Sequence, residues 1–320
     1  MKLLITGCAG FIGVNFTKFW LKRHPDDTIV GVDILTYAAN LDGLAELKKY
    51  PAFRFYRADI CDGRAIDEIF QKERPTALVN FAAESHVDRS IIDADIFVKT
   101  NVLGTQVLLN AATRYALKRF HQISTDEVYG DLPLQGGEKF LETSPLKPSS
   151  PYSASKAAAD LLALSYVRTH GLSVTVSRCS NNYGEYQHGE KFIPTAIGKA
   201  LSGEKIPVYG TGENVRDWLY VTDHCFAVEK ILLSGKSGEI YNIGGGCELD
   251  NKTLAQKILT TFDRPLSQID FIADRKGHDL RYAVDFSKIQ TEFGWSPQTP
   301  FEEGLAQTAA WYASRFNEKA

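Results

Sequence analysis

The chain has 320 residues, of which 44% are hydrophobic and 23% are charged, and its formal net charge is −3. This composition is typical of a globular protein, excludes a largely disordered chain, and gives no general attraction to nucleic acid or anionic membranes. The length exceeds that of a usual single domain, so we expect one large lobe with a smaller partner.

The cysteines and histidines give no sign of a cross-linked or metal-holding protein. The five cysteines are widely spaced and contain no CxxC pair, which argues against a disulfide framework or a thiolate metal site. The seven histidines show no metal-ligand spacing, so no metal is expected. The chain starts directly with a strand-like run and contains no apolar run of 18 residues, and we therefore expect a cytoplasmic protein.

A strand, a glycine-rich turn and a helix are predicted at the start of the chain. Residues 2–6 form a short apolar run, GCAGFIG follows at residues 7–13, and residues 14–21 have the apolar spacing of a helix. The next apolar run, at residues 29–32, ends in Asp33, twenty residues after the last glycine of the turn. A dinucleotide-binding βαβ unit has its ribose-binding acid at this distance.

Each glycine of the turn has its own physical reason. Gly7 permits a tight turn, Gly10 lets backbone N–H groups approach a pyrophosphate, and Gly13 allows close packing of the helix on the sheet. A carboxylate at Asp33 would repel a 2′-phosphate. The pattern therefore predicts a site for NAD rather than NADP.

Strands and helices continue to alternate through the first half of the chain. We expect strands at residues 53–58, 77–82 and 120–124, and helices at residues 65–71 and 96–117. This alternation predicts an α/β fold with a doubly wound parallel (Rossmann) sheet and ligands at the carboxyl ends of the strands. Those ends are Gly7, Asp33, Asp59, Ala82 and Thr125.

A tyrosine and a lysine lie one helical turn apart in the sequence SPYSASK. Tyr152 and Lys156 should face the same side of a helix. Lowering the pKa of a phenol from about 10 to near neutrality requires about 4 kcal/mol. A lysine ammonium at about 4 Å can supply that much at an effective dielectric near 20. Together with the dinucleotide turn and a hydroxyl at Ser124 or Thr125, the pair predicts Tyr152 as a general base.

Two adjacent acids, Asp126 and Glu127, follow the strand that ends at Thr125. Such a pair is ordinarily a solvated turn. Beside a newly formed ketone, however, one carboxylate can remove the acidified C–H proton while the other, still protonated, donates to a departing hydroxyl. Adjacent acids push their pKa values apart, which provides one group in each form. The pair therefore suggests elimination in addition to oxidation.

Motifs along nearly the whole chain resemble the nucleotide-sugar 4,6-dehydratases of the extended short-chain dehydrogenase/reductase family. The motifs are GCAGFIG, VDILTYAANL, NFAAESHVDRSI, STDEVYGDL, PSSPYSASKAAADLL, SRCSNNYG, NVRDWLYVTDH and GHDLRYAVD. The resemblance implies oxidation of a nucleotide-diphospho-hexose at C4, loss of water across C5 and C6, and return of the hydride to C6. It also implies NAD as a permanently bound cofactor and dTDP-glucose as the expected substrate.

The resemblance assigns a role to each of five catalytic residues. Tyr152 would take the proton of the 4-hydroxyl, Thr125 would position the reacting oxygen, and Lys156 would hold the nicotinamide ribose. Glu127 would take the C5 proton, and Asp126 would protonate the leaving 6-hydroxyl.

The resemblance also gives the residues expected at the two ligands. At the cofactor these are Gly7, Gly10, Phe11, Ile12, Gly13, Asp33, Asp59, Ile60, Ala82, Ala83, Thr100, Tyr152, Lys156 and Asn182. At the nucleotide sugar they are Ser85, Thr125, Asn181, Glu190, Lys191, Pro207, Tyr209, Arg216, Asn251 and His278. Tyr209 has a flat ring that suits stacking on the base, and the guanidinium fork of Arg216 suits the diphosphate.

The second half of the chain is expected to pass into the smaller lobe and back. We expect the NAD-binding lobe to comprise residues 1–178 and 215–245, and a discontinuous sugar-binding lobe to comprise residues 179–214 and 246–320. Further strands are expected at residues 172–176 and 239–243, with helices at 222–233, 254–261 and 301–316.

One loop departs from the family pattern NNYGPYQFPEKLIP. Here it is NNYGEYQHGEKFIP, with Glu185 and Gly189 in place of prolines and His188 in place of an aromatic residue. We therefore expect a more mobile loop, and a carboxylate at Glu185 near the sugar diphosphate that alters which substrate is accepted.

Other functions stay open at this point. The substrate could be a UDP-, CDP- or GDP-sugar, and a 4-epimerase or decarboxylase of the same fold is a second enzyme class, although neither needs Asp126 and Glu127. A catalytically silent NAD-binding regulator would have no use for the reactive residues. A homodimer is expected from the family, through the helices at residues 96–117 and 152–170.

Overall fold

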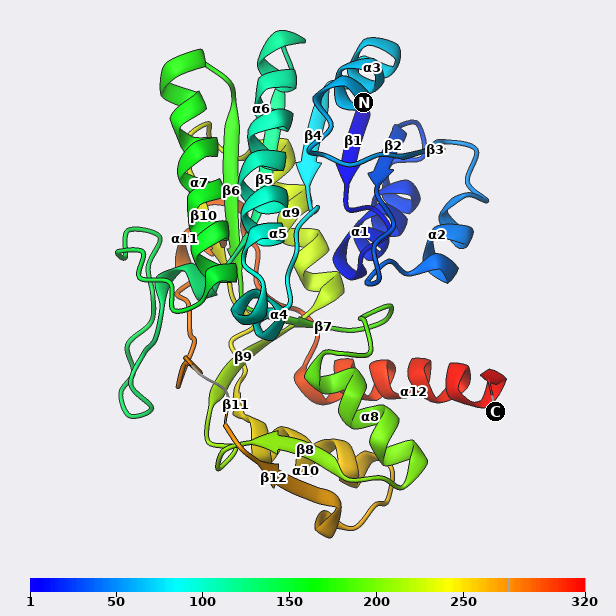
Figure 1. Ribbon diagram of the computed structural model, residues 1–320, viewed down its shortest axis with the longest axis vertical. Helices are drawn as coiled ribbons and strands as arrows, with labels where there is room; N and C mark the ends of the chain where they lie inside the picture. The colour runs from blue at the N-terminus through cyan, green and yellow to red at the C-terminus, as the bar shows by residue number, and fades with distance from the viewer. Residues whose placement is uncertain (275–276, 320) are drawn as a thin grey trace.

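The computed structural model of the protein describes residues 1–274 and 277–319. Its centre is a seven-stranded sheet in the order β10-β6-β5-β4-β1-β2-β3, in which every pair of neighbours is parallel (Figure 1). The predicted doubly wound parallel sheet is therefore confirmed. Its strands are β1 (Lys2–Thr6), β2 (Thr28–Asp33), β3 (Phe53–Arg57), β4 (Ala77–Asn80), β5 (Arg119–Thr125), β6 (Val174–Cys179) and β10 (Ile240–Ile243).

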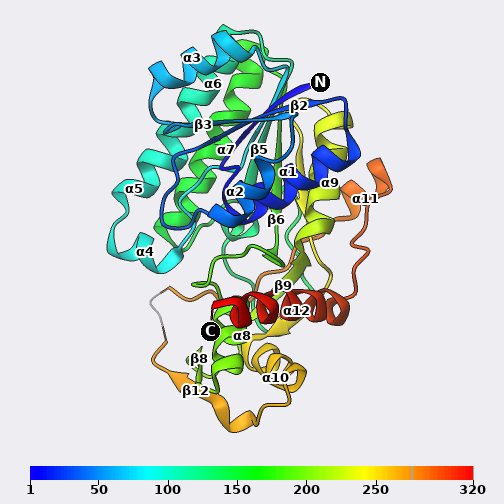
Figure 2. The same ribbon diagram turned by 90° about the vertical axis from the view of Figure 1, so that its right-hand side faces the viewer.

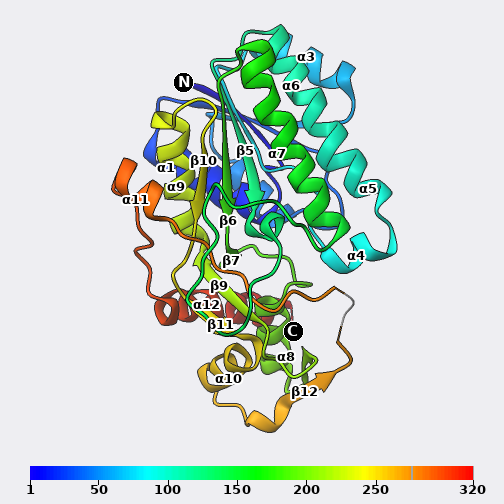
Figure 3. The same ribbon diagram turned by 90° about the vertical axis from the view of Figure 1, so that its left-hand side faces the viewer.

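The sheet separates two apolar layers, each covered by helices (Figures 2 and 3). Side chains alternate along each strand, so Leu3 and Ile5 belong to one layer while Leu4 belongs to the other. Both layers are needed because a parallel sheet is apolar on its two faces. The first face carries α1 (Phe11–Arg23), α2 (Leu41–Leu47), α9 (Val221–Ser234) and α11 (Ser287–Phe293), and the second carries α3 (Gly63–Glu73), α6 (Thr105–Arg114) and α7 (Pro151–His170).

Helix α7 has strong signals at both ends. Ser150 and Ser153 form a reciprocal capping box at its start, where Pro151 is the first helical residue. Gly171 ends the helix with a left-handed φ of 66°. The helix is held on β6 by an ion pair of 2.9 Å between Arg178 Nε and Asp160 Oδ2, whose side chains are 2% and 0% exposed.

A continuous helical run from Asp95 to Arg114 covers most of the helix expected at residues 96–117, but part of it is a π turn. The structure has α4 (Val87–Ile92), a short α5 (Asp95–Phe97), a π-helical turn (Val98–Gly104) and then α6. The π turn lets the amide of Asn101 donate to Glu84 O (3.0 Å) and Ser155 Oγ (2.8 Å) while it accepts from Glu84 N (2.9 Å). The π turn therefore joins α7 to the segment that follows β4.

The smaller lobe is built from short strands and three helices around its own core. The chain leaves it after β9 for α9 and β10 of the large sheet and then returns, so the lobe is discontinuous as expected. The structure places β9 in the small three-stranded sheet, while the exact lobe boundaries stay a prediction. Its sheets are β11-β9-β7 and β12-β8, formed by β7 (Asn181–Tyr183), β8 (Ile206–Tyr209), β9 (Val215–Tyr220), β11 (Glu248–Asp250) and β12 (Ile269–Ile272). Its helices are α8 (Phe192–Ser202), α10 (Asn251–Thr261), α12 (Phe301–Lys319) and a 3₁₀ turn (Leu266–Gln268).

We expect two glycine-to-alanine changes to have opposite effects on stability. A Cβ at Gly13 would lie 2.0 Å from the carbonyl oxygen of Gly7, so Gly13→Ala should lower the free energy of unfolding by about 3 kcal/mol. A Cβ at Gly198, inside α8, would meet no atom within 4 Å, so Gly198→Ala should raise it by about 0.5–1 kcal/mol. Urea unfolding measures both, and equal midpoints for the two variants would contradict the close packing of the turn.

Candidate active site

The carboxyl ends of the strands open into two adjoining cavities. Gly7 lines both cavities, Asp33, Asp59 and Ala82 line the second, and Thr125 lines the first. All five predicted strand ends therefore face one continuous site. The first cavity continues to the loop between β7 and α8, which belongs to the smaller lobe.

The glycine turn leaves room only for backbone. Gly7 has a φ of 66°, and a Cβ there would lie 2.7 Å from Ala82 N. The carboxylate of Asp33 accepts hydrogen bonds from Ala9 N (2.9 Å) and Leu35 N (2.8 Å), which ties the turn to the end of β2. Burial raises the pKa of Asp33 above its ordinary value. This bare backbone beside a carboxylate fits the pyrophosphate and ribose of a dinucleotide.

Each residue expected at the cofactor lines one of the two cavities. The second cavity includes Asp33, Asp59, Ile60, Ala82 and Thr100, and both include Gly7, Gly10 and Ala83. The first includes Phe11, Ile12, Gly13, Tyr152, Lys156 and Asn182. The placement fits the expected dinucleotide, and the binding role of each residue remains a prediction.

Helix α7 brings Tyr152 and Lys156 to the end of β5. The Lys156 ammonium donates a hydrogen bond of 2.6 Å to the carbonyl oxygen of Ile123. Burial lowers the pKa of Lys156, and the charge of Asp160 opposes this shift. Both side chains line the first cavity and are buried.

The pKa of Tyr152 differs from the sequence-based expectation. We expected Lys156, helped by the positive nicotinamide, to bring it toward neutrality. In the chain without cofactor, burial and the charge of Glu127 raise the pKa of Tyr152 well above its ordinary value. Burial removes the water that would solvate a phenolate, and this effect outweighs a hydrogen bond from Thr125 that lowers the pKa. The chain alone therefore keeps Tyr152 as a phenol.

The acid pair lies in a 3₁₀ turn (Asp126–Tyr129) that begins where β5 ends. The Thr125 hydroxyl accepts from Glu127 N (3.3 Å) and donates to Asp126 Oδ1 (3.3 Å). Burial, with the charges of Glu127 and Asp217, raises the pKa of Asp126 well above its ordinary value. Asp126 is therefore held as a carboxylic acid, which is the form that a proton donor needs.

Asn182 is oriented by a histidine that the sequence did not single out. His224 is completely buried, and burial lowers its pKa to about 3, so its ring is neutral. Its Nδ1 lies 2.9 Å from Asn182 Oδ1, and the Asn182 amide donates to Ser180 O (3.0 Å). No local sequence signal marks His224, because α9 brings it to Asn182 from 42 residues away.

Other residues of the first cavity were also missed. Ser180 and Gln187 line it, as does Cys179, whose thiol pKa is raised to about 12 by burial. Ser124, one of the two hydroxyls considered in the sequence, lines the same cavity. The sequence shows such side chains as ordinary strand-end and turn residues, and only the fold brings them together.

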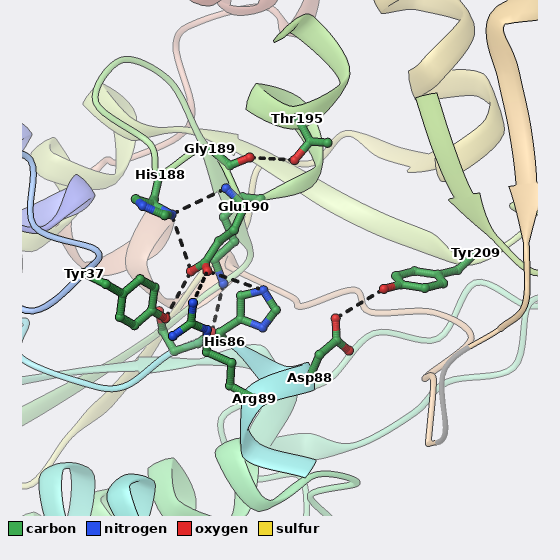
Figure 4. Close-up of polar contacts among 11 residues, drawn as sticks. Tyr37, His86, Asp88, Arg89, His188, Gly189, Glu190, Thr195 and Tyr209 are labelled. Carbon is green, nitrogen blue, oxygen red and sulfur yellow. Dashed lines mark hydrogen bonds and ion pairs between the residues drawn. The ribbon is translucent and has the colours of Figure 1, made fainter. Parts of the chain in front are cut away.

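A polar cluster surrounds Glu190 at the rim of the first cavity (Figure 4). Its carboxylate lies 3.3 Å from the Tyr37 hydroxyl, 3.6 Å from His86 Nε2, 3.8 Å from an Arg89 nitrogen and 3.7 Å from His188 Nδ1. The Arg89 guanidinium also stacks 3.6 Å from the centre of the Tyr37 ring. The cluster joins the loop before α8 to α4 and to the loop after β2.

The residues expected at the nucleotide sugar fall into two groups. Ser85, Thr125, Asn181, Glu190 and Lys191 line the first cavity, and the Lys191 ammonium donates to Ser85 O (2.9 Å). Pro207, Tyr209, Arg216, Asn251 and His278 do not line either of the two cavities and belong to the smaller lobe.

One member of the second group, Arg216, acts on the acid pair, while Tyr209 and His278 contact each other. Tyr209 donates to Asp88 Oδ2 at 3.4 Å (Figure 4), and the rings of Tyr209 and His278 meet edge to face at 6.0 Å. The Arg216 guanidinium donates to Asp279 O (3.0 Å), and its charge lowers the pKa of Asp126. The smaller lobe thus brings a cation toward the acid pair.

Glu185 is held away from the cavity lining. Its carboxylate accepts hydrogen bonds from the Tyr220 hydroxyl at 2.9 and 3.0 Å, and its carbonyl oxygen accepts from the Asn15 amide at 2.9 Å. Gly189 O accepts from Thr195 Oγ1 at 2.7 Å. The Glu185 carboxylate is therefore paired with Tyr220 rather than directed into the cavity, and the greater mobility of the loop stays a prediction.

The described part of the chain offers neither a metal-binding group of side chains nor a membrane-spanning helix. Within residues 1–274 and 277–319, no three His, Cys, Asp or Glu side chains are grouped so that they could hold a metal ion. Across the same residues, no helix has both the length and the apolar character needed to cross a membrane.

The known proteins to which the chain is similar indicate one family. Residues 4–308 match the model of the GDP-mannose 4,6 dehydratase family. The chain is 48% identical over 316 residues to the dTDP-glucose 4,6-dehydratase of Streptomyces niveus, which covers 98% of this chain and 93% of that protein. The crystal structure of dTDP-glucose 4,6-dehydratase from Streptomyces venezuelae, with NAD bound, is similar with a TM-score of 0.96 and 46% identity over 99% of this chain and 98% of that one. The structure of UDP-glucose 4-epimerase from Thermus thermophilus, in complex with NAD, has a TM-score of 0.90 and 28% identity over 98% of this chain and 99% of that one.

We expect Asp126→Asn to stabilise the fold at neutral pH. Because the carboxyl pKa is raised in the folded state, stability is lost as pH rises from about the ordinary value of 3.8 toward the raised value. An amide avoids this loss, so the variant should unfold at a higher temperature at pH 7 and at an unchanged temperature at pH 3. Thermal unfolding at both pH values measures this, and Asp285→Asn, whose carboxyl pKa is lowered, should destabilise at pH 7. Equal shifts at both pH values would contradict the assignment of Asp126 as a buried acid.

Proposed function

The chain belongs to the nucleotide-sugar 4,6-dehydratases of the extended short-chain dehydrogenase/reductase family, and we propose that it converts dTDP-glucose to dTDP-4-keto-6-deoxyglucose and water with NAD as its cofactor. One observation carries the proposal: a buried carboxylic acid, Asp126, lies beside Glu127 in the cavity that holds Tyr152 and Lys156. Oxidation needs only a base and a hydroxyl, whereas elimination also needs an acid and a second base.

The cofactor fits the glycine turn. Backbone N–H groups at Gly10 meet the pyrophosphate at the start of α1, and Asp33 accepts from the adenosine ribose. When bound, NAD accepts the hydride from C4 of the sugar and later supplies it to C6. Its positive nicotinamide also favours the phenolate form of Tyr152, which the chain alone disfavours.

Oxidation uses the group on α7. Tyr152 takes the proton of the 4-hydroxyl, and Lys156 places a positive charge beside the cofactor ribose while its ammonium is fixed on Ile123 O. Thr125 positions the reacting oxygen with its hydroxyl, and Asn182, oriented by His224, lies at the nicotinamide side of the same cavity.

Elimination uses the acid pair. The new ketone at C4 acidifies the C5 proton, which Glu127 removes, while Asp126 donates a proton to the leaving 6-hydroxyl. Each transfer typically contributes about 10²–10⁴ in rate. Glu127 returns its proton to C5 as the hydride reaches C6, so the sugar leaves as a 4-keto-6-deoxy product.

The rest of the substrate lies between the lobes. Ser85, Glu190 and Lys191 contact the sugar and the near phosphate from the cavity rim, since they line the first cavity. Arg216 binds the diphosphate and Tyr209 stacks on the base from the smaller lobe. Pro207, Asn251 and His278 complete this end of the substrate.

We expect the purified protein to form a 4-keto-6-deoxy product from dTDP-glucose without added NAD. A panel of dTDP-, UDP-, CDP- and GDP-glucose, with NAD and product measured by chromatography and NMR, tests the substrate and the cofactor together. Glu127→Gln should lose at least about 10²-fold in kcat and abolish solvent-deuterium incorporation at C5. Inverted C4 without loss of the 6-hydroxyl would instead establish an epimerase, and preferred turnover of another nucleotide would replace dTDP.

We also propose that two copies of the chain associate through α7 and its neighbours. Large apolar side chains are exposed on α4, the π turn and α7, where Ile92 is 87%, Val98 54% and Leu161 60% exposed. These elements pack against one another, and α4 and α7 lie together on the second face of the sheet (Figure 3). Exposed apolar side chains on several packed helices are typical of a protein interface.

We expect Leu161→Glu to convert the dimer to a monomer. Burying two carboxylates at a symmetric interface is unfavourable, because each copy presents the same residue. Light scattering during size-exclusion chromatography measures the mass. Leu266→Glu, a similarly exposed leucine (53%) on the smaller lobe, is the matched control and should leave the mass unchanged. A monomer for the unsubstituted chain would overturn this proposal.

A further inference from the structure

The proposed reaction leaves two side chains in the wrong protonation state. Tyr152 starts as a phenolate and gains the proton of the 4-hydroxyl. Asp126 starts as an acid and loses its proton to the 6-hydroxyl, which leaves as water. Glu127 gains one proton from C5 and later returns one to C5, and this proton can exchange with solvent in between, so Glu127 ends as it began. The overall reaction neither takes up nor releases a proton, so each cycle must move one proton from Tyr152 to Asp126.

The Thr125 hydroxyl contacts Asp126 in the cavity that Tyr152 also lines. It donates to Asp126 Oδ1 at 3.3 Å, and hydrogen bonding by Thr125 also lowers the pKa of Tyr152. All three side chains line the same cavity. A threonine hydroxyl has one donor and two acceptor positions, so it can receive a proton from one partner while it passes its own to the other.

We propose that Thr125 is a proton relay that restores the site after each turnover by returning the proton from Tyr152 to Asp126. The step rests on the proposed function. Its balance is simple: the Tyr152 O–H bond breaks as a new O–H bond forms on Thr125, and the Thr125 O–H bond breaks as one forms on Asp126. No electrons are transferred, and no other reactant is needed.

Burial favours this internal route over exchange with bulk water. Asp126 is 1%, Thr125 8% and Tyr152 9% exposed. Oδ2 of Asp126 is buried and meets no hydrogen-bond partner among the described residues. The Asp126 carboxyl group is therefore hydrogen-bonded to the site through Oδ1 and the Thr125 hydroxyl. The same low solvation that keeps Asp126 protonated would slow its recharging from solvent.

The three groups can be hydrogen-bonded in sequence both before and after the proton shift. After water loss, the Tyr152 phenol donates to Thr125 and Thr125 donates to the Asp126 carboxylate. After the proton shift, Asp126 donates to Thr125 and Thr125 donates to the Tyr152 phenolate. The second arrangement is the one required for the next oxidation.

The relay can be separated from the positioning role of Thr125 by comparing one turnover with many. Thr125→Val and Thr125→Ala remove the hydroxyl, and Thr125→Ser keeps it. Rapid-quench measurement with enzyme in excess gives the single-turnover rate, and substrate in excess gives kcat. For either hydroxyl-less variant we expect a burst of one product per site followed by a kcat about 10²-fold below the single-turnover rate. Added imidazole, a small proton carrier, should raise this kcat and leave the single-turnover rate unchanged.

Thr125→Ser should show no burst. Ser124→Ala is the matched control, because Ser124 lines the same cavity and its hydroxyl acts on Asp160 rather than on Asp126. It should keep the ratio of kcat to single-turnover rate found for the unsubstituted chain. Equal losses in both rates for Thr125→Val and Thr125→Ala, with no burst and no imidazole effect, would overturn the relay and leave Thr125 as a positioning group. An unsubstituted chain that forms no 4-keto-6-deoxy product would instead overturn the proposed function, and the relay with it.

Discussion

Two buried cations fix helix α7 against the sheet, and the active site depends on them. The Lys156 ammonium is bound to the end of β5 through Ile123 O, and Arg178 on β6 is paired with Asp160. Tyr152, Lys156 and Asp160 follow one another at intervals of four residues, so these contacts fix the face that carries the phenol. A buried ion pair contributes little net stability compared with an apolar pair, but removing one partner costs about 3–5 kcal/mol. The ion pair therefore determines where α7 lies on the sheet, but it adds little to the net free energy that holds the helix there.

The same low-dielectric environment determines the chemistry of the groups that α7 meets. Burial raises the pKa of Asp126, Tyr152 and Cys179 and lowers that of His224, in each case because the charged form is poorly solvated. Burial is the largest cause of the raised pKa of Asp126, so the fold itself favours the protonated form that a proton donor needs. It also makes the phenolate of Tyr152 dependent on a positive charge that arrives with the cofactor. The fold itself is shared with a 4-epimerase at 28% identity, so the architecture alone does not distinguish dehydration from epimerisation.

Features with a local signal were predictable from the sequence, and features that depend on distant contacts were not. The strand–turn–helix of Gly7, Gly10 and Gly13, the acid at Asp33 and the strand ends were correct because period and spacing reflect local geometry. The π turn was missed because it depends on where Asn101 meets Glu84 and Ser155. The effect of burial on the pKa of Tyr152 could not be predicted from the sequence, because the spacing of Tyr152 and Lys156 does not show how deeply the fold buries the phenol. His224 and the contact between Glu185 and Tyr220 link segments far apart in the chain, and no spacing rule describes them.

The discontinuous smaller lobe has a consequence for synthesis on the ribosome. Six of the seven strands of the large sheet come from residues 2–179, so most of that sheet can pair while the rest of the chain is still being translated. Its last strand, β10, adds at one edge and reaches the sheet only after β7, β8 and β9 of the smaller lobe have emerged. Until then the backbone groups of β6 on that side have no strand to pair with, and an unpaired edge can bind other chains. Because β10 is translated late, the nascent protein is most prone to pair wrongly with other chains before residue 243 leaves the exit tunnel.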